Sequence, residues 1–207
     1  MMSHLRAKFT LAVLSSAFLW LPAVGQEPKP ANLPTPSVKV DVILEGNLAE
    51  KFSPPGAGFS VLLPGKPKTE VQDLDTEIGK VTNHMYLVDA PGVSYAVMYA
   101  EFPAPITDPE VARAMFDNAR ILAVAAVRGD VKSESEITLS GYPGRELLVS
   151  MPGGLGMLRA RMYMVEQFFY QAITLSAPES KAETLKLREA EVKKFFDSFT
   201  LVADKDK

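Results

Sequence analysis

The order of strand-forming and helix-forming segments constrains the fold of this chain more than any other feature. Short alternating segments come in two runs, and one helical segment follows each run. Within the first run, residues 77–79 and 89–92 are brief turns of the length that hairpins use. Hairpin strands are antiparallel, and segregation of strands from helices is typical of α+β proteins, not of doubly wound parallel sheets. The sequence therefore predicts an α+β fold, an antiparallel sheet with two main helices packed against it.

The expected strands fall in two groups of four. They cover residues 58–63, 69–76, 79–89 and 93–102, and then residues 131–139, 145–150, 157–165 and 168–176. Residues 198–201 are expected to form a short final strand or a tail.

The first helical segment begins at a strong capping signal. Asp108 takes the N-cap, Pro109 the first helical position and Glu110 the first turn, while Gly129 ends the helix. Because residues 121–127 are apolar all round, we expect this half to be covered on more than one side. The predicted buried stripe consists of Val111, Met115, Ala119, Leu122 and Ala126.

The second helix is predicted over residues 179–196. Ser180 and Glu183 have the spacing of a capping box at its start. Its apolar stripe is narrow, which favours a helix that lies on a sheet over one buried inside the domain. The stripe comprises Ala182, Leu185, Val192 and Phe196.

Residues 1–25 have the pattern of a cleavable signal peptide. Arg6 and Lys8 precede an apolar run over residues 9–21, and small residues at 23 and 25 precede a cleavage position before Gln26. The run of about 13 residues is shorter than the roughly 20 that a spanning helix needs, which disfavours an uncleaved anchor. We therefore expect a protein that is exported to the periplasm or the cell exterior and is soluble after cleavage.

The rest of the chain divides into three parts. Residues 26–51 form a Pro-rich linker, in which residues 40–44 are either a first edge strand or a short apolar anchor on the domain. The folded domain is expected over residues 52–202, and residues 203–207 are a solvated tail.

Composition excludes several classes of function. The chain has no cysteine, which rules out disulfides, thiol catalysis, cysteine-ligated zinc and lipid attachment at an N-terminal cysteine. Its 22 basic and 25 acidic side chains include no basic block, so nucleic acid is a poor candidate partner.

The strand predicted over residues 157–165 carries the main candidate binding group. Arg159, Arg161 and Tyr163 alternate with apolar residues and therefore share one face. Two guanidinium groups about 7 Å apart can bind an anionic group. The alternative is cross-strand pairing with acids such as Glu146 or Glu101, which would keep the face soluble.

Residues 141–145 add two candidates to this set. Tyr142 is either an exposed recognition aromatic or a packing residue, and Arg145 follows it at the end of a Gly- and Pro-containing turn. The methionines are dense in the same region, where they fill a core or line an apolar groove. They are Met151, Met157, Met162 and Met164.

Sites for catalysis and metal binding find little support. His84 is the only histidine after the signal segment; a triad would need it beside Asp89 and Ser94, and there is no G-x-S-x-G motif. The alternating acids at 73, 75 and 77 lack the spacing of a calcium loop and are expected to form a solvated strand face. We therefore predict no catalytic residue, no metal site and no cofactor.

Several short motifs together resemble the PsbP-like superfamily. They are Gly58-Phe-Ser-Val-Leu-Leu-Pro-Gly65, Tyr95-Ala-Val-Met-Tyr99, Gly141-Tyr-Pro-Gly-Arg-Glu-Leu147, Arg159-Ala-Arg-Met-Tyr163 with Phe169-Tyr170, and Phe195-Phe-Asp-Ser-Phe199. The resemblance covers residues 52–202. The superfamily includes the PsbP extrinsic subunit of photosystem II. The resemblance implies an α/β/α sandwich and a binding or accessory role without catalysis, and no metal ligand of the family matches His84.

These observations favour an exported, soluble, non-enzymatic domain that binds a protein partner in the envelope or outside the cell. The first alternative is a small-molecule or lipid carrier whose cleft is lined by Arg159 and Arg161. The second is a hydrolase that uses His84.

Overall fold

The large sheet is the centre of the fold. The computed structural model describes residues 50–76 and 79–202. Within them, seven strands form one sheet in the order β3-β4-β5-β9-β8-β7-β6, and all neighbours are antiparallel. The strands are β3 (Lys68–Thr76), β4 (Gly79–Ala90), β5 (Val93–Glu101), β6 (Asp130–Leu139), β7 (Tyr142–Ser150), β8 (Met157–Val165) and β9 (Phe168–Ser176).

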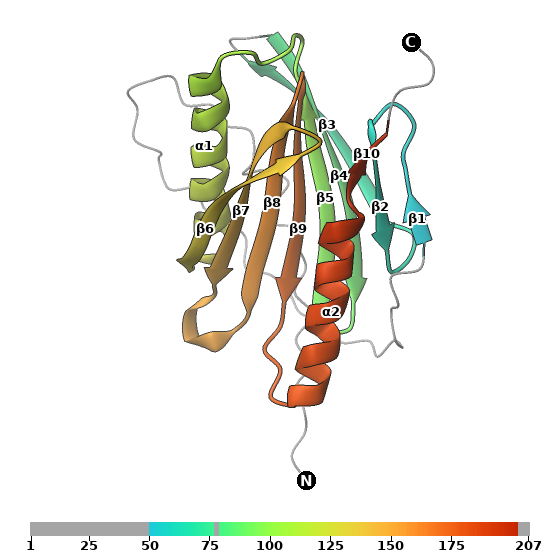
Figure 1. Ribbon diagram of the computed structural model, residues 1–207, viewed down its shortest axis with the longest axis vertical. Coiled ribbons are helices and arrows are strands. Elements are labelled where there is room, and N and C mark those ends of the chain that lie inside the picture. Colours follow the sequence, from blue (N-terminus) through green and yellow to red (C-terminus); the bar gives the residue numbers. More distant parts are fainter. Residues whose placement is uncertain (1–49, 77–78, 203–207) are drawn as a thin grey trace.

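Two helices and a small second sheet complete the described part (Figure 1). The helices α1 (Pro109–Val127) and α2 (Ala182–Ser198) pack on opposite faces of the large sheet. The small sheet has the order β1-β2-β10 and packs on the α2 side. Its strands are β1 (Glu50–Phe52), β2 (Phe59–Leu63) and β10 (Thr200–Leu201). The predicted α+β fold with two helices on an antiparallel sheet is confirmed.

The connection through α1 explains the strand order. After β5, α1 carries the chain to the far edge of the sheet, and the hairpins from β6 to β9 bring it back beside β5. Both edges of the sheet, β3 and β6, are rich in exposed polar side chains. Such edges discourage uncontrolled strand pairing.

The ends of α1 agree with the prediction, but its buried face does not. The Asp108 carboxylate accepts a hydrogen bond from the Glu110 backbone N–H, and Arg128 closes the helix in the left-handed conformation. The buried residues are Ala112, Phe116, Ala119 and Ala123, so only Ala119 of the predicted stripe is fully buried, while Met115 and Ala126 pack partly buried against the core. Ile121 is 54% exposed, so the prediction that residues 121–127 are covered on several sides is also wrong. Small alanines around Phe116 let the helix backbone approach the sheet closely, whereas Val111 and Ile121 are left exposed.

The start of α2 also differs from the prediction. The helix begins at Ala182, and no side chain caps it at Lys181; instead the Glu179 carboxylate accepts the Lys181 backbone N–H at 2.9 Å. The predicted Ser180–Glu183 capping box is therefore wrong. Only Val192, Phe195 and Phe196 are buried, so Ala182 and Leu185 of the predicted stripe are exposed.

Arg188 fastens the exposed half of α2 to the sheet. Its guanidinium donates to the Ala177 carbonyl at 2.7 Å and pairs with Glu179 at 3.3 Å. It also lies against Gly92, where an added Cβ would be 2.4 Å from the Arg188 side chain. Gly92 has a φ of +78°, a conformation that favours glycine.

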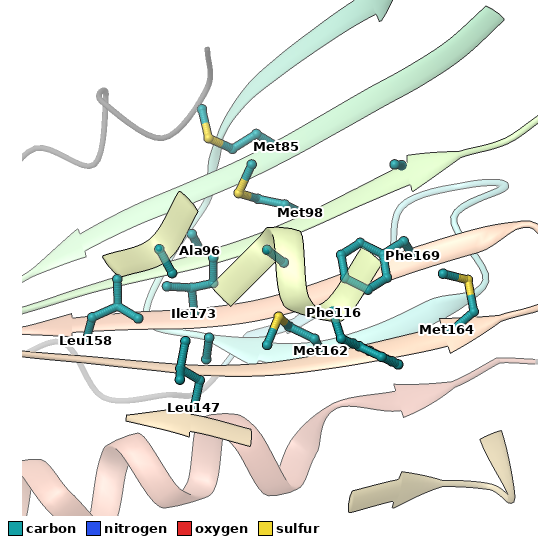
Figure 2. Close-up of a cluster of buried hydrophobic side chains, with 14 of the residues drawn as sticks. Met85, Ala96, Met98, Phe116, Leu147, Leu158, Met162, Met164, Phe169 and Ile173 are labelled. Carbon is teal, nitrogen blue, oxygen red and sulfur yellow. The ribbon is translucent and has the colours of Figure 1, made fainter. Parts of the chain in front are cut away.

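The core between the sheet and α1 is rich in methionine (Figure 2). Gln171 of β9 lies among these residues; it is 5% exposed, and its side-chain oxygen has no hydrogen-bond partner in the described part of the chain. The sheet contributes Met85, Met98, Met162 and Met164, together with Ala96, Leu147, Leu158, Phe169 and Ile173.

The core between the sheet and α2 is aromatic instead. Phe59 stacks on Phe199 with ring centroids 5.2 Å apart, and the Tyr170 hydroxyl donates to the Ala57 carbonyl at 2.8 Å. Burial raises the pKa of Tyr95 to about 12, so these phenols are neutral at ordinary pH. The cluster also includes Tyr86, Tyr99, Tyr163, Phe195 and Phe196.

Several predicted segments lie outside the described residues. They are the signal peptide, the linker up to residue 49 with its segment 40–44, Glu77, and the tail. The first strand begins at Glu50, two residues before the expected domain start. No helix in residues 50–76 and 79–202 is long and apolar enough to cross a membrane.

Candidate functional site

The side of the sheet that carries α2 is only partly covered. The helix lies over the central strands, where Phe195 contacts Tyr95 of β5, and it meets β8 near its C-terminal end through Phe196 and Asp197. Beyond α2, no helix of the described part lies over β6, β7 and β8 on this side (Figure 1). We call this surface the open face: Ser133, Ser135, Tyr142, Glu146, Leu148, Arg159 and Arg161.

Strand register decides which of the predicted site residues meet there. Arg161 lies opposite Glu146, and Arg159 opposite Leu148, so both arginines point to the α2 side. Tyr163 is two residues from Arg161 on β8, and Tyr142 is four residues from Glu146 on β7, so these two side chains also point to the α2 side. Arg145 is next to Glu146 on β7 and therefore points to the other side, toward α1. It is thus separated from Arg159, Arg161, Tyr163 and Tyr142.

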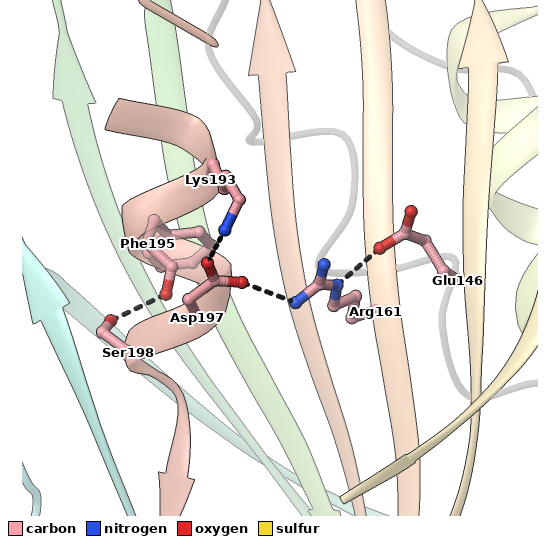
Figure 3. A network of polar contacts seen from close by, with 6 residues as sticks. All are labelled: Glu146, Arg161, Lys193, Phe195, Asp197 and Ser198. Carbon is pink, nitrogen blue, oxygen red and sulfur yellow. Dashed lines mark hydrogen bonds and ion pairs between the residues drawn. The ribbon is translucent and has the colours of Figure 1, made fainter. Parts of the chain in front are cut away.

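Arg161 is held on both sides by acids (Figure 3). Its Nε donates to Glu146 Oε2 at 2.5 Å, and its Nη1 donates to Asp197 Oδ1 at 3.3 Å. The guanidinium also lies over the Phe196 ring, 5.2 Å from the centroid. Burial lowers its pKa, but the bonds to Glu146 and Asp197 outweigh this and raise it overall. Lys193 also bonds Asp197 and lowers the pKa of that carboxyl, so the charges of this cluster are largely offset.

Arg159 differs from Arg161 in having no ion pair within the described residues. It lies two residues before Arg161 on β8, between Leu148 of β7 and Thr174 of β9. Its side chain is partly exposed, and the neighbouring Ser133 and Ser135 of β6 are exposed. The positive charge that this face can offer to a ligand is therefore that of Arg159.

Tyr163 belongs to the core and not to the accessible surface. It is 4% exposed and stacks on Phe199, with ring centroids 5.9 Å apart. A Cβ at Gly144, its cross-strand neighbour, would lie 2.5 Å from the Tyr163 ring. Gly144 therefore lets this ring lie across β7, where it is buried and not accessible from the open face.

Tyr142 lies at the edge of the open face and is partly exposed. Its hydroxyl donates to Glu166 Oε1 at 3.3 Å, and the negative charge of Glu166 raises the pKa of Tyr142. Its ring also packs against the aromatic core. Tyr142 is therefore a packing residue whose side chain also reaches the surface, and its role in recognition stays a prediction.

Arg145 fastens the opposite face to α1. Its Nη1 bonds Asp117 Oδ1 at 2.5 Å and Glu134 Oε1 at 2.8 Å, and its guanidinium lies 5.4 Å from the Phe116 ring centroid. Asp117, Glu134 and Arg145 line a shallow polar hollow together with Arg120, which pairs with Glu134 at 3.7 Å. Both arginines of the hollow already have acidic partners, so Arg145 is not a free binding group.

His84 is not arranged for hydrolysis. Its ring stacks on Tyr99 at 4.3 Å with an interplanar angle of 7°, and burial lowers its pKa. Ser94 donates to Asp89 at 2.6 Å, but these two lie on the other face of the sheet, five residues along β4 from His84. The three residues therefore cannot form a triad.

The acids of β3 do not form a metal site. Asp73 pairs with Lys80 at 2.8 Å and accepts a hydrogen bond from Thr82 at 2.9 Å, and these bonds lower the pKa of Asp73. No group of three or more histidines and acids in the described ranges could hold a metal ion.

Comparison with solved structures identifies the fold. The solution structure of cyanobacterial PsbP (CyanoP) from Synechocystis sp. PCC 6803 matches 79% of this chain and 98% of its own chain, with a TM-score of 0.50 and 12% identity. The chain has a PsbP-like fold. This likeness, at so low an identity, concerns the fold and carries over no function.

The other comparisons add little. A crystal structure from Bacteroides thetaiotaomicron VPI-5482 matches 77% of this chain and 51% of its own, at 12% identity and a TM-score of 0.37. No family model matches the sequence, and no curated protein matches it.

Proposed function

We propose that this PsbP-like chain is an exported, non-enzymatic accessory domain and that its open face binds a protein partner. The observation that supports this most strongly is Arg159, a partly exposed cation with no ion pair in the described residues. It lies beside the compensated Arg161–Glu146 pair, on a sheet surface that no described helix covers. A carboxylate on the partner would supply the missing counter-charge.

The shape of the surface favours a protein over a small molecule. A small-molecule site usually encloses most of its ligand in a concave pocket. The spaces between the sheet and the two helices are filled by buried side chains, and the open face is a pleated surface of polar and apolar residues. A lipid or small-molecule carrier therefore has weaker support, and the position of His84 argues against the hydrolase.

The accessory role has separate support from the sequence motifs that resemble the PsbP-like superfamily. That resemblance implies a binding or accessory protein, and export is the role predicted for residues 1–25. The mass of the chain recovered from the periplasm or medium tests export directly, because cleavage before Gln26 is expected. A chain that stays in the cytoplasm at full mass would contradict this part of the proposal.

The partner interaction is tested by charge reversal on the open face. The tagged chain would be used to capture proteins from an envelope extract of its host, next to the variants Arg159→Glu and Arg113→Glu. Arg113 is an exposed arginine on α1, so the control changes the net charge equally at a different surface. We expect a partner that the native chain and Arg113→Glu retain and Arg159→Glu loses.

Two results would count against the proposal. A partner retained equally by both variants would place the docking surface elsewhere. Failure to capture any specific partner under any condition would contradict the accessory role itself.

A further inference from the structure

The outward side of α1 carries an apolar ridge that the fold does not use. Val111 is 42% exposed and Ile121 is 54% exposed, and Ala114 and Ala125 are exposed between and beyond them. At 100° per residue these four lie within a stripe about 80° wide on the helix surface, which also contains the half-buried Asn118. We call Val111, Ala114, Ile121 and Ala125 the outer ridge.

The outer ridge is distinct from the stripe that packs on the sheet. The buried stripe of Ala112, Phe116, Ala119 and Ala123 lies on the opposite side of the helix. A helix on the surface of a monomer usually presents polar residues there. Charged residues flank the outer ridge on one side, among them Glu110, Asp117 and Arg128, and the apolar Met115 and Leu122 flank it on the other. A largely apolar stripe with a charged border is typical of a helix that packs against another helix.

We propose that the outer ridge binds a second copy of this chain, with the two α1 helices antiparallel about a two-fold axis near residue 118. The sizes of the residues favour this arrangement. Such an axis places Val111 opposite Ala125 of the second copy, and Ala114 opposite its Ile121. Each large side chain then meets a small one, so the two helices can pack closely at both ends of the contact.

The charges favour the same direction. An antiparallel two-fold brings the same flank of both helices together, so Glu110 at the start of one helix lies near Arg128 at the end of the other. Symmetry repeats this pair, which gives two contacts between opposite charges. In the structure Glu110 has only an exposed pairing with Arg113 at 3.7 Å, and Arg128 has no ion pair in the described residues. A parallel arrangement would bring the charged flank against the flank that carries Met115 and Leu122.

The proposed contact leaves the open face accessible. The α1 helix lies on the opposite side of the sheet, so a dimer through the outer ridge would present two open faces outward. One pair of helices is a small interface, for which we expect weak, concentration-dependent association. This inference is independent of the proposed partner interaction, because it rests on other residues and another side of the molecule.

The first test is sedimentation over a range of protein concentrations, using the whole chain as it is recovered from its host. We expect a reversible monomer–dimer equilibrium. The variant Ile121→Lys should raise the dissociation constant by about tenfold or more, since it places a charge at the centre of the contact. Leu187→Lys is the matched control, because Leu187 is 65% exposed on α2 and should leave the constant within about twofold.

The second test reports the direction of the helices. Because the chain has no cysteine, engineered single cysteines are the only thiols present. A mixture of Val111→Cys and Ala125→Cys chains should form disulfide-linked dimers under mild oxidation. Val111→Cys alone should not, because its two copies would be about 21 Å apart along the antiparallel helices.

Three results would overturn the proposal. They are a monomer at all concentrations, a dimer that Ile121→Lys leaves unchanged, and efficient cross-linking of Val111→Cys with itself. The first would leave the ridge to a different protein, the second would place the dimer contact elsewhere, and the third would make the helices parallel.

Discussion

The two faces of the large sheet hold their helices with the same arrangement but fill their cores with different side chains. On each face, a sheet arginine lies over a phenylalanine of the helix and bonds the aspartate that follows it. On the α1 face these are Arg145, Phe116 and Asp117, and on the α2 face they are Arg161, Phe196 and Asp197. The arginines thus act as links between the sheet and a helix on both sides.

The cores behind these links differ in stiffness. The α1 face combines alanines of the helix with flexible methionines of the sheet, whereas the α2 face is built from rigid aromatic rings. Methionine adapts to irregular spaces, while stacked and edge-on rings need fixed geometry. We therefore expect the α2 face to be the less tolerant of substitution.

Truncation of an aromatic residue on the α2 face should have the largest effect. Phe195 is fully buried and contacts both Tyr95 and Phe196. We expect Phe195→Ala to lower the free energy of unfolding by about 3–5 kcal/mol, measured by urea denaturation. Met162→Leu on the other face should cost less than about 1.5 kcal/mol, because it conserves volume. Equal costs would contradict the difference in stiffness.

The two arginine links should differ in strength. The Arg145 side chain is 14% exposed and has two close acidic contacts, whereas that of Arg161 is 26% exposed and its contact with Asp197 is longer. We expect Arg145→Ala to cost about 2 kcal/mol and Arg161→Ala about 1 kcal/mol. Double-mutant cycles with Asp117→Ala and Asp197→Ala measure each link separately. A stronger coupling for Arg161 than for Arg145 would reverse this order.

A further substitution tests the polar residue in the methionine core. Gln171 lies opposite Met98 and Met162, with its oxygen unpaired in the described residues. A buried amide without a partner costs about 1–3 kcal/mol, so we expect Gln171→Met to stabilise the protein by about 1 kcal/mol in the same assay. Destabilisation would show that the amide contributes a favourable contact.

The smallest expected effect concerns His84 and pH. Burial lowers its pKa in the folded protein, so the unfolded chain binds a proton more readily. Stability should therefore be full above the ordinary histidine pKa of about 6.5 and should fall as pH drops below it. His84→Gln should remove this slope in thermal unfolding between about pH 7 and pH 5. An unchanged slope in that variant would assign it to other groups.

The fold was readable from the sequence because turn residues and capping signals are local. Asp108 and Pro109 mark the start of α1 correctly, and the hairpin turns predict the antiparallel order. The buried face of α1 was not readable, since apolar residues lie on both sides of the helix and three of the four buried residues are alanines. Which stripe meets the sheet depends on the fit of Ala112 and Ala119 to the strands, which is a property of the packed structure.

The candidate site was predicted only in part, for a similar reason. Strand alternation places Arg159 and Arg161 on one face, but it does not show that Asp197 neutralises only one of them. The separation of Arg145 follows from register, which a single strand does not reveal. The repeated Phe-Asp pair at 116–117 and 196–197 is the signal in the sequence that could have pointed to the two arginine links.

The most direct test of the central claim uses neighbouring positions on β6 that point to opposite faces. Ser135 lies opposite Glu146 and faces the α2 side, while Glu136 lies opposite Arg145 and faces α1. A photo-reactive amino acid would be placed at each position in turn, and the chain irradiated in its host. We predict that an envelope protein is cross-linked from position 135 and not from position 136. Cross-linking from position 136 alone, or equally from both, would contradict the assignment of the open face as the docking surface.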